Sequence, residues 1–166
     1  MNVMKELKLD KVTLHCGTAD QAKLAKCLKL LEIISNRKAV KTYSRKRIPA
    51  FGIRPGLSIG CKVTVRGKAG IELLRRMMEG LGNKIKRKQF NKDSFSFGIK
   101  EYIQVPSIPY QRDIGIIGLE VTVTLKRPGY NVKNRKIKSG KIPKRHIITT
   151  DETVDFAKNK LNITVI

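Results

Sequence analysis

Residues 41–66 read KTYSRKRIPAFGIRPGLSIGCKVTVR, and two different patterns meet in this stretch. From residue 59 to 66, apolar and polar side chains alternate, which is typical of a strand with one face on a core and the other face free. Before it, four cations surround the aromatic Phe51, and two prolines and two glycines interrupt the chain. The stretch therefore predicts a strand preceded by a basic loop, residues 46–58, that projects from the fold and suits phosphate and sugar contacts.

Outward from this stretch, alternation or extended character predicts four more strands, at residues 8–16, 40–44, 95–102 and 116–126. Apolar residues at helical spacing predict three helices, at residues 18–36, 68–81 and 149–160. The order β-α-β-loop-β-α-β-β-α predicts a single α+β domain over residues 1–166. We expect a mainly antiparallel sheet of about five strands, with the helices packed on one face.

Local signals refine these elements. Thr18 with Gln21, and Thr149 with Glu152, have the form of capping boxes. The helices are expected to bury two apolar stripes: Leu24, Cys27, Leu28, Leu31 and Ile34 in the first, and Ile71, Leu74, Met77, Met78 and Leu81 in the second. Phe95 and Phe97 share a face with Ile99, which favours core packing over base stacking. The open sheet face should carry Lys11, Thr13, Lys62, Thr64, Arg66, Thr122 and Lys126.

Charge is the most unusual bulk property. Among 166 residues, 36 Lys and Arg stand against 13 Asp and Glu, a net charge of +23. No acid occurs between Glu32 and Glu72, or between Glu120 and Asp151, so two basic tracts lack balancing charge. The second includes residues 127–148, an irregular segment broken by proline and glycine. Nucleic acid is the expected partner. A membrane is not expected, because no apolar run approaches the length of a spanning helix.

Catalytic chemistry is not indicated. The two histidines, His15 and His146, have no partner pattern, no carboxylate pair marks a pocket, and no phosphate-binding glycine motif is complete. Cys16, Cys27 and Cys61 lack metal-ligand spacing and lie on apolar faces. We therefore expect buried free thiols rather than disulfides or metal ligands, no cofactor, and no enzyme activity.

Several motifs, in order and spacing, resemble one family. They are NVMK at residue 2, SRKRIPAFGIRPGLSIG at 44, KVTVRG at 62, FSFGIKE at 95, IGIIGLEV at 114, RPGY at 127 and KIPKRHIIT at 141. The chain resembles the universal large-subunit ribosomal protein five family, which binds 5S rRNA and is called protein eleven in eukaryotes. The compact FGIRPG loop and the KIPKRH segment resemble the archaeal and eukaryotic branch.

The resemblance implies a cytoplasmic structural constituent of the large ribosomal subunit, located in the central protuberance. Its implied partners are 5S rRNA, large-subunit rRNA, the P-site tRNA, neighbouring central-protuberance proteins and, at an intersubunit bridge, a small-subunit head protein. The implied tRNA-binding residues are Arg45, Lys46, Arg47, Phe51, Gly52, Ile53, Arg54 and Gly56. The implied rRNA-binding residues are Asn2, Arg37, Lys38, Lys41, Thr42, Lys62, Arg66, Arg127, Tyr130, Arg135, Lys136, Lys138, Lys141, Lys144, Arg145 and His146. Arg37 stands where the family commonly has glutamine.

Two other classes of protein remain open. A free RNA or DNA chaperone, or a nucleoid-type protein, would share the charge but would need no family-like order of motifs. An RNA-modifying enzyme would need a cofactor cradle or an acid–base pair, for which the sequence offers no pattern.

Overall fold

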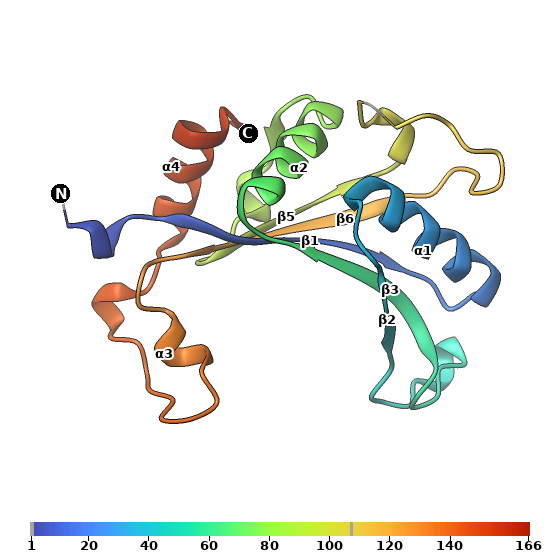
Figure 1. Cartoon of the computed structure of the whole chain (residues 1–166), viewed down its shortest axis with the longest axis horizontal. Helices are drawn as coiled ribbons and strands as arrows, with labels where there is room; N and C mark the ends of the chain where they lie inside the picture. Colours follow the sequence, from blue (N-terminus) through green and yellow to red (C-terminus); the bar gives the residue numbers. More distant parts are fainter. Residues whose placement is uncertain (1, 107) are drawn as a thin grey trace.

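Five antiparallel strands form the central sheet in a computed structural model that describes residues 2–106 and 108–166. The order across the sheet is β2-β3-β1-β6-β5 (Figure 1). The strands are β1 (Lys8–Gly17), β2 (Val40–Tyr43), β3 (Ser58–Val65), β5 (Ser94–Ile99) and β6 (Leu119–Lys126). The predicted single α+β domain with a mainly antiparallel five-stranded sheet is confirmed.

Three helices lie on one side of this sheet: α1 (Gln21–Ser35), α2 (Gly67–Gly80) and α4 (Thr150–Leu161) (Figure 1). A short helix, α3 (Asn131–Asn134), lies on the other side. The predicted packing of the long helices on one face is therefore confirmed. Within the described residues, no helix is both long and apolar enough to cross a membrane.

A small parallel pair was not expected. Residues 84–92 are mostly polar and basic, yet β4 (Lys84–Ile85) pairs with β7 (Thr164–Val165) near the C-terminus. The Ile85 side chain is buried. Two-residue strands are too short to produce a readable period, so this pairing had no sequence signal.

The core lies between the sheet and the helices, and it follows the alternation of the strands. Val12, Leu14 and Cys16 of β1 are buried, as are the corresponding apolar residues of β3 and β6. Phe95 and Phe97 are also buried, which confirms core packing for these rings. β1 lies inside the sheet, paired with both β3 and β6, and this central position explains why its apolar and polar residues alternate so clearly.

The start of α1 differs from the predicted capping box. Asp20 is the N-cap, and its side chain accepts a hydrogen bond from the Ala22 amide at 2.9 Å. Thr18 instead accepts from the Asp20 amide at 3.2 Å, just before the helix. Gln21 exchanges hydrogen bonds with Ser58 of β3, at 3.0 and 2.8 Å. The competing Asp20 cap and the link to β3 thus override the predicted box.

The helix faces also differ in detail. In α1, Leu30 is fully buried while Leu28 is only half-buried. In α2, the buried set contains Gly70 and Leu73, whereas Ile71 is 37% exposed. A Cβ atom at Gly70 would lie 3.2 Å from the Val65 carbonyl oxygen, so the glycine lets α2 approach β3 closely. As a result, the buried face of α2 includes Gly70, and Ile71 lies at the edge of that face.

Candidate nucleic-acid interface

The sheet face opposite the helices carries a row of hydroxyl groups. Thr64 of β3 pairs with Thr13 of β1, Thr13 pairs with Thr122 of β6, and Thr122 pairs with Ser96 of β5. Directly paired residues point to the same side of a sheet, so these four side chains form one line across four strands. Hydroxyls both donate and accept hydrogen bonds, which suits contact with phosphate and ribose oxygens.

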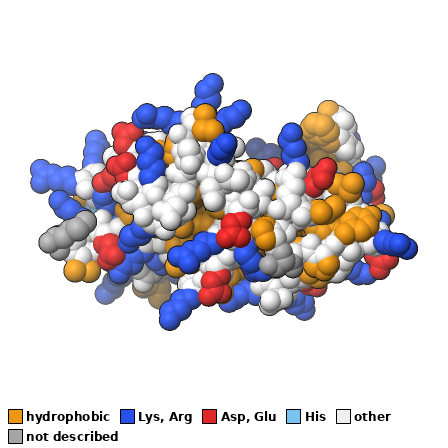
Figure 2. Space-filling model, turned by 90° about the horizontal axis from the view of Figure 1, so that it is seen from above, with side chains coloured by type: hydrophobic (Ala, Val, Ile, Leu, Met, Phe, Trp, Pro, Cys, Tyr) orange, Lys and Arg blue, Asp and Glu red, His pale blue; other side chains and the backbone are white. Residues whose placement is uncertain are grey.

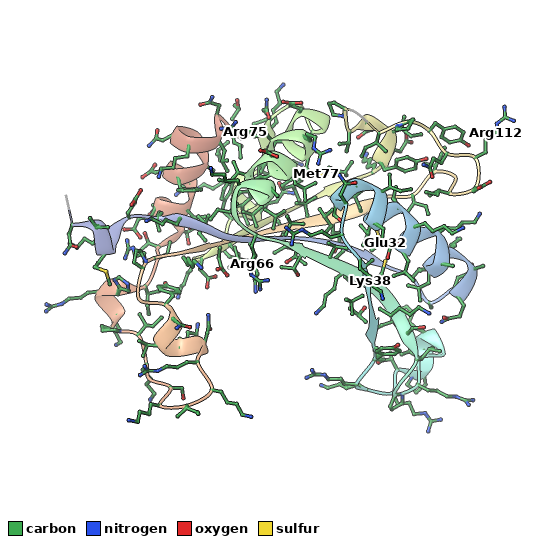
Figure 3. The ribbon with its side chains drawn as sticks, in the orientation of Figure 1. Glu32, Lys38, Arg66, Arg75, Met77 and Arg112 are labelled. Carbon is green, nitrogen blue, oxygen red and sulfur yellow. The ribbon has the colours of Figure 1, made fainter. Side chains whose placement is uncertain are left out.

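Charge on this open face is mainly positive. Lys62 and Arg66 are exposed, and Arg66 extends below the sheet in Figure 3. Two acids are present, and both have a partner. Glu120 lies 3.6 Å from His15, and Asp10 lies 2.7 Å from the Lys126 ammonium. Because Asp10 neutralises Lys126, this predicted open-face cation adds less positive charge to the open face than Lys62 or Arg66 does.

The segment between β2 and β3 is a compact basic tip, residues 45–57. Its base is closed by hydrogen bonds from the Ser44 amide to the Leu57 carbonyl and from the Gly56 amide to the Ser44 carbonyl, both 2.9 Å. Higher up, Ile48 and Ile53 exchange backbone hydrogen bonds of 2.9 and 3.1 Å. The tip is therefore a compact turn structure, because many of its backbone groups find hydrogen-bond partners within it.

The basic tip presents most of its predicted contact residues to the outside. Phe51 is 73% exposed, and Arg45, Lys46, Arg47 and Arg54 are also exposed. None of these four cations has an ion-pair partner within the described part of the chain. Ile53 is half-buried, so at that position the tip offers mainly its backbone.

Two glycines shape the basic tip. Gly52 has φ of 64° and Gly56 has φ of 82°, conformations that side chains with a Cβ rarely adopt. Nothing lies within 4 Å of a Cβ built at either position. Their backbones are therefore open to close approach by a partner, and backbone conformation alone explains both glycines within this chain.

The second basic segment, residues 127–148, folds into short connected turns that include α3. Gly140 donates to the Val132 carbonyl at 3.1 Å, and the Arg135 side chain donates to the Lys138 carbonyl at 2.7 Å. These bonds hold an irregular chain in a defined shape. The exposed cations of this segment include Arg135, Lys136, Lys138, Lys141, Lys144 and Arg145.

Tyr130 and His146 lie at the base of this segment and are half-buried. Their rings are 5.9 Å apart, and His146 Nε2 lies 2.8 Å from the Pro128 carbonyl oxygen. The Tyr130 hydroxyl accepts a hydrogen bond from the Ile148 amide at 3.4 Å. Both side chains therefore stabilise the segment, and only the parts of their rings that are exposed can contact a partner.

Arg127 occupies a different environment from its neighbours. It is 5% exposed, and its guanidinium binds Glu152 at 2.5 Å and the Ile147 carbonyl at 3.4 Å. The buried guanidinium offers little surface to a phosphate and supports the fold through Glu152, while the implied rRNA contact of Arg127 stays a prediction. The RPGY motif gave no sign of this difference, because Glu152 lies 25 residues further along the chain.

Glu152 contacts both the start of residues 127–148, at Arg127, and the residue just after their end, Thr149. It accepts from the Thr149 amide at 2.9 Å in the confirmed capping box of α4, while also binding Arg127. Burial opposes ionisation, but the Thr149 amide and the Arg127 charge lower the pKa of Glu152. The ionised carboxylate thus holds the start and the end of residues 127–152 together.

The remaining predicted residues extend these two regions. Asn2 accepts from the Met4 amide at 3.0 Å, and the Met4 side chain lies against Gly129. Arg37 and Lys38 are exposed in the turn after α1, where Glu32 accepts from the Ala39 amide at 3.1 Å. Lys41 is exposed on β2, whereas Thr42 is half-buried beside Gly60.

The two basic regions flank the open sheet face. In Figure 1, residues 45–57 and residues 127–148 both descend from the sheet on the side away from α1, α2 and α4, at opposite ends of the molecule. The helix side differs, because acidic and apolar side chains are interspersed among its cations (Figure 2). Sequence reasoning missed that Thr13, Thr64, Thr122 and Ser96 align in one row. The sequence shows that each of these residues lies on the polar face of its strand. It does not show how neighbouring strands are aligned, and that register is what places the four side chains in one row.

Comparison with known proteins matches the sequence to one family along most of its length. The family model described as ribosomal protein L5 matches residues 2–54, and the model for the C-terminus of the same ribosomal family matches residues 58–156. Large ribosomal subunit protein uL5 of Methanosphaera stadtmanae is 38% identical over 99% of both chains. The protein of the same name from Nanoarchaeum equitans is 39% identical over 98% of both, and that from Sulfolobus acidocaldarius is 38% identical over 99% of this chain and 94% of its own.

Proposed function

The chain belongs to the ribosomal protein L5 family, of archaeal type, and on that premise we propose that it binds 5S rRNA and large-subunit rRNA in the central protuberance. Membership makes it a structural, non-enzymatic constituent of the large ribosomal subunit, and hence a cytoplasmic protein. The match to relatives along almost the whole chain disfavours a free nucleic-acid chaperone, which would share only the charge.

One observation carries the proposal of RNA binding. The open sheet face, with its row of hydroxyls, lies between two basic segments whose cations are mostly unpaired. Phosphate contacts would come from the segments, and ribose contacts from the hydroxyls between them. Double-stranded RNA is recognised largely through its phosphates and 2′-hydroxyls, which matches this chemistry.

We assign different RNA partners to different parts of this surface. The rRNA contacts are proposed for Asn2, Arg37, Lys38, Lys41, Thr42, Lys62, Arg66, Tyr130, Arg135, Lys136, Lys138, Lys141, Lys144, Arg145 and His146. The basic tip is proposed to contact the P-site tRNA through Arg47, Arg54 and Phe51. Its exposed aromatic ring supports this assignment, because an aromatic ring can stack on a base or pack on a ribose. Neighbouring central-protuberance proteins and a small-subunit head protein at an intersubunit bridge complete the proposed set of partners.

The test uses full-length protein and transcribed 5S rRNA in a filter-binding assay at fixed salt. In one variant, Lys141, Lys144 and Arg145 become alanine; in the control, Lys23, Lys26 and Lys29 on the exposed side of α1 become alanine. Both variants lose three charges. We expect the first to bind at least about tenfold more weakly and the control to change little, because counterion release requires local contact. Equal loss in both would contradict a defined interface.

A further inference from the structure

Three thiols from three different elements meet beneath α1. Cys16 of β1 is directly opposite Cys61 of β3 in the sheet register, and Cys27 of α1 lies against both. The three sulfur atoms all lie within 4.8 Å of one another. The side chains are 4%, 3% and 0% exposed for Cys16, Cys27 and Cys61 respectively, and all three are free.

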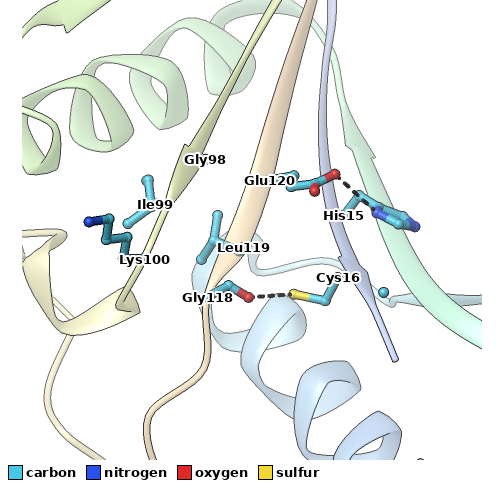
Figure 4. A pocket seen from close by; sticks show the side chains of 9 residues that line it. His15, Cys16, Gly98, Ile99, Lys100, Gly118, Leu119 and Glu120 are labelled. Carbon is cyan, nitrogen blue, oxygen red and sulfur yellow. Dashed lines mark hydrogen bonds and ion pairs between the residues drawn. The ribbon is translucent and has the colours of Figure 1, made fainter. Parts of the chain in front are cut away.

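The thiols are held in an apolar environment. A hydrogen bond with Cys61, together with burial, raises the pKa of Cys16, and burial raises the pKa of Cys27. Cys16 also lies 3.4 Å from the Gly118 carbonyl oxygen, to which its S–H donates (Figure 4). The same hydrogen bond with Cys16 lowers the pKa of Cys61, so it shifts the two thiols in opposite directions, while burial disfavours the charged form of each thiol. Any ion that enters must not leave a large net charge in the core.

We propose that Cys16, Cys27 and Cys61 form a binding site for a trivalent thiophilic ion that takes three sulfur ligands, with arsenic(III) as the probe. Zinc–thiolate bonds are about 2.3 Å long, and bonds of similar length to a pyramidal three-coordinate ion place the sulfurs about 3.5 Å apart. The three sulfurs, all within 4.8 Å of one another, therefore start close to that geometry and have to approach one another when the ion binds.

The reaction is a ligand exchange without oxidation or reduction. Arsenous acid, As(OH)3, exchanges its three hydroxyl groups for three sulfurs. Three As–O bonds break, three As–S bonds form, and each thiol proton leaves with a hydroxyl group as water. The product, As(S-Cys)3, is neutral. A zinc or monovalent copper ion on three thiolates would leave negative charge in the core, and zinc would also need a fourth ligand.

A route to the cluster is visible at the surface. A cavity of about 320 Å³ is lined by Cys16 and by residues at the ends of β1, β5 and β6 (Figure 4). Gly118 and Gly98 line this cavity without side chains to narrow it. The cavity therefore makes Cys16 the proposed point of entry, and Cys27 and Cys61 do not line it.

The experiment treats reduced, full-length protein with arsenite, removes excess by desalting, and measures arsenic per chain by mass spectrometry. We expect one arsenic per chain, loss of all three thiols in a titration with a thiol reagent after denaturation, and a raised Tm. The sign of the Tm change is decisive, because a ligand of the native state stabilises it whereas a ligand of the unfolded chain lowers Tm. A lowered Tm or no retained arsenic would overturn the proposal.

Single alanine variants separate the three ligands. Cys16→Ala, Cys27→Ala and Cys61→Ala should each weaken arsenite binding at least about tenfold, the scale on which even outer-sphere changes act at metal sites. Circular dichroism checks that each variant is folded. If one of the three variants does not fold, the arsenite affinities of the other two still test the three-sulfur site. Unchanged affinity in any folded variant would reduce the site to a dithiol and contradict the three-sulfur proposal.

Discussion

At the scale of single residues, the buried pair of Arg127 and Glu152 gives the most specific stability prediction. Arg127→Ala removes a guanidinium that is 6% exposed at its side chain and leaves Glu152 without its charge partner. Breaking a fully buried pair costs about 3–5 kcal/mol, and the 40% exposure of Glu152 reduces this to about 2 kcal/mol. Urea denaturation measures the change in unfolding free energy.

The matched control for that variant is Arg87→Ala. Arg87 binds Asp151 at 2.9 Å, also at the start of α4, but both side chains are more than 70% exposed. Exposed pairs contribute about 0–1 kcal/mol, so the control should change stability by less than half as much. Equal destabilisation by both variants would show that the Arg127 pair does not depend on burial.

Glu152 predicts a pH effect with a definite sign. Burial alone would raise its pKa, but the Thr149 amide and the Arg127 charge bring the folded-state pKa below the ordinary value of 4.5. A lowered folded-state pKa adds stability above the unfolded-state pKa, and that stability is lost as pH falls through the folded-state value. Glu152→Gln should therefore lose stability at pH 7 and show a shallower decline between about pH 5 and pH 3.

The control for the pH experiment is Glu72→Gln on the exposed side of α2. Glu72 has no ion-pair partner among the described residues. Its variant should retain the acid-dependent decline of the parent protein. Denaturation midpoints measured across the same pH series decide between the two variants. Parallel curves for Glu152→Gln and the parent would contradict the proposed linkage.

At the scale of elements, the basic tip is predicted to act separately from the rest of the RNA surface. Arg47→Ala with Arg54→Ala should leave 5S rRNA binding within about threefold of the parent, because these cations are remote from residues 127–148. Retention of P-site tRNA on reconstituted ribosomes should fall at least about tenfold, through loss of two phosphate contacts. Phe51→Ala tests the ring alone. Equal loss of both activities would refute the division.

The elements also show what sequence can and cannot predict here. Strict alternation located β1, β3 and β6, because one buried and one open face impose a period of two. The face of α2 was misjudged, because it depends on how the chain turns from Val65 at the end of β3 into α2 and brings Gly70 against the Val65 carbonyl. The compact basic tip depends on hydrogen bonds between Ile48 and Ile53, which composition does not reveal.

The candidate site was predictable in composition but not in arrangement. Basic tracts without acids identified the right class of partner, and the order of motifs identified the family. Arg127 counted as one more surface cation until its contact with Glu152 was known. The three cysteines, separated by 11 and 34 residues, had no metal-ligand spacing, and only the pairing of β1 with β3 under α1 brings them together.

At the scale of the whole molecule, charge distribution explains how a chain of net charge +23 remains folded. Cations and acids are mixed on the helix side, whereas two cation-rich segments stand apart on either side of the open sheet face (Figures 1 and 2). Separation reduces repulsion between the segments, and RNA phosphates would neutralise both at once. Binding to RNA should therefore be strongly dependent on salt.

Salt titration measures this dependence directly. If about 6–10 phosphates are neutralised, the slope of log K for 5S rRNA against log salt should lie between about −4 and −9, at 0.7–0.9 per phosphate. Alanine at Lys141, Lys144 and Arg145 should make this slope shallower by about 2–3, one phosphate contact for each lost cation. The tip variant with alanine at Arg47 and Arg54 should keep the parent slope, because its phosphates belong to tRNA. A parent slope near zero would refute the electrostatic interface, and a shallower slope in the tip variant would show that 5S rRNA reaches both basic regions.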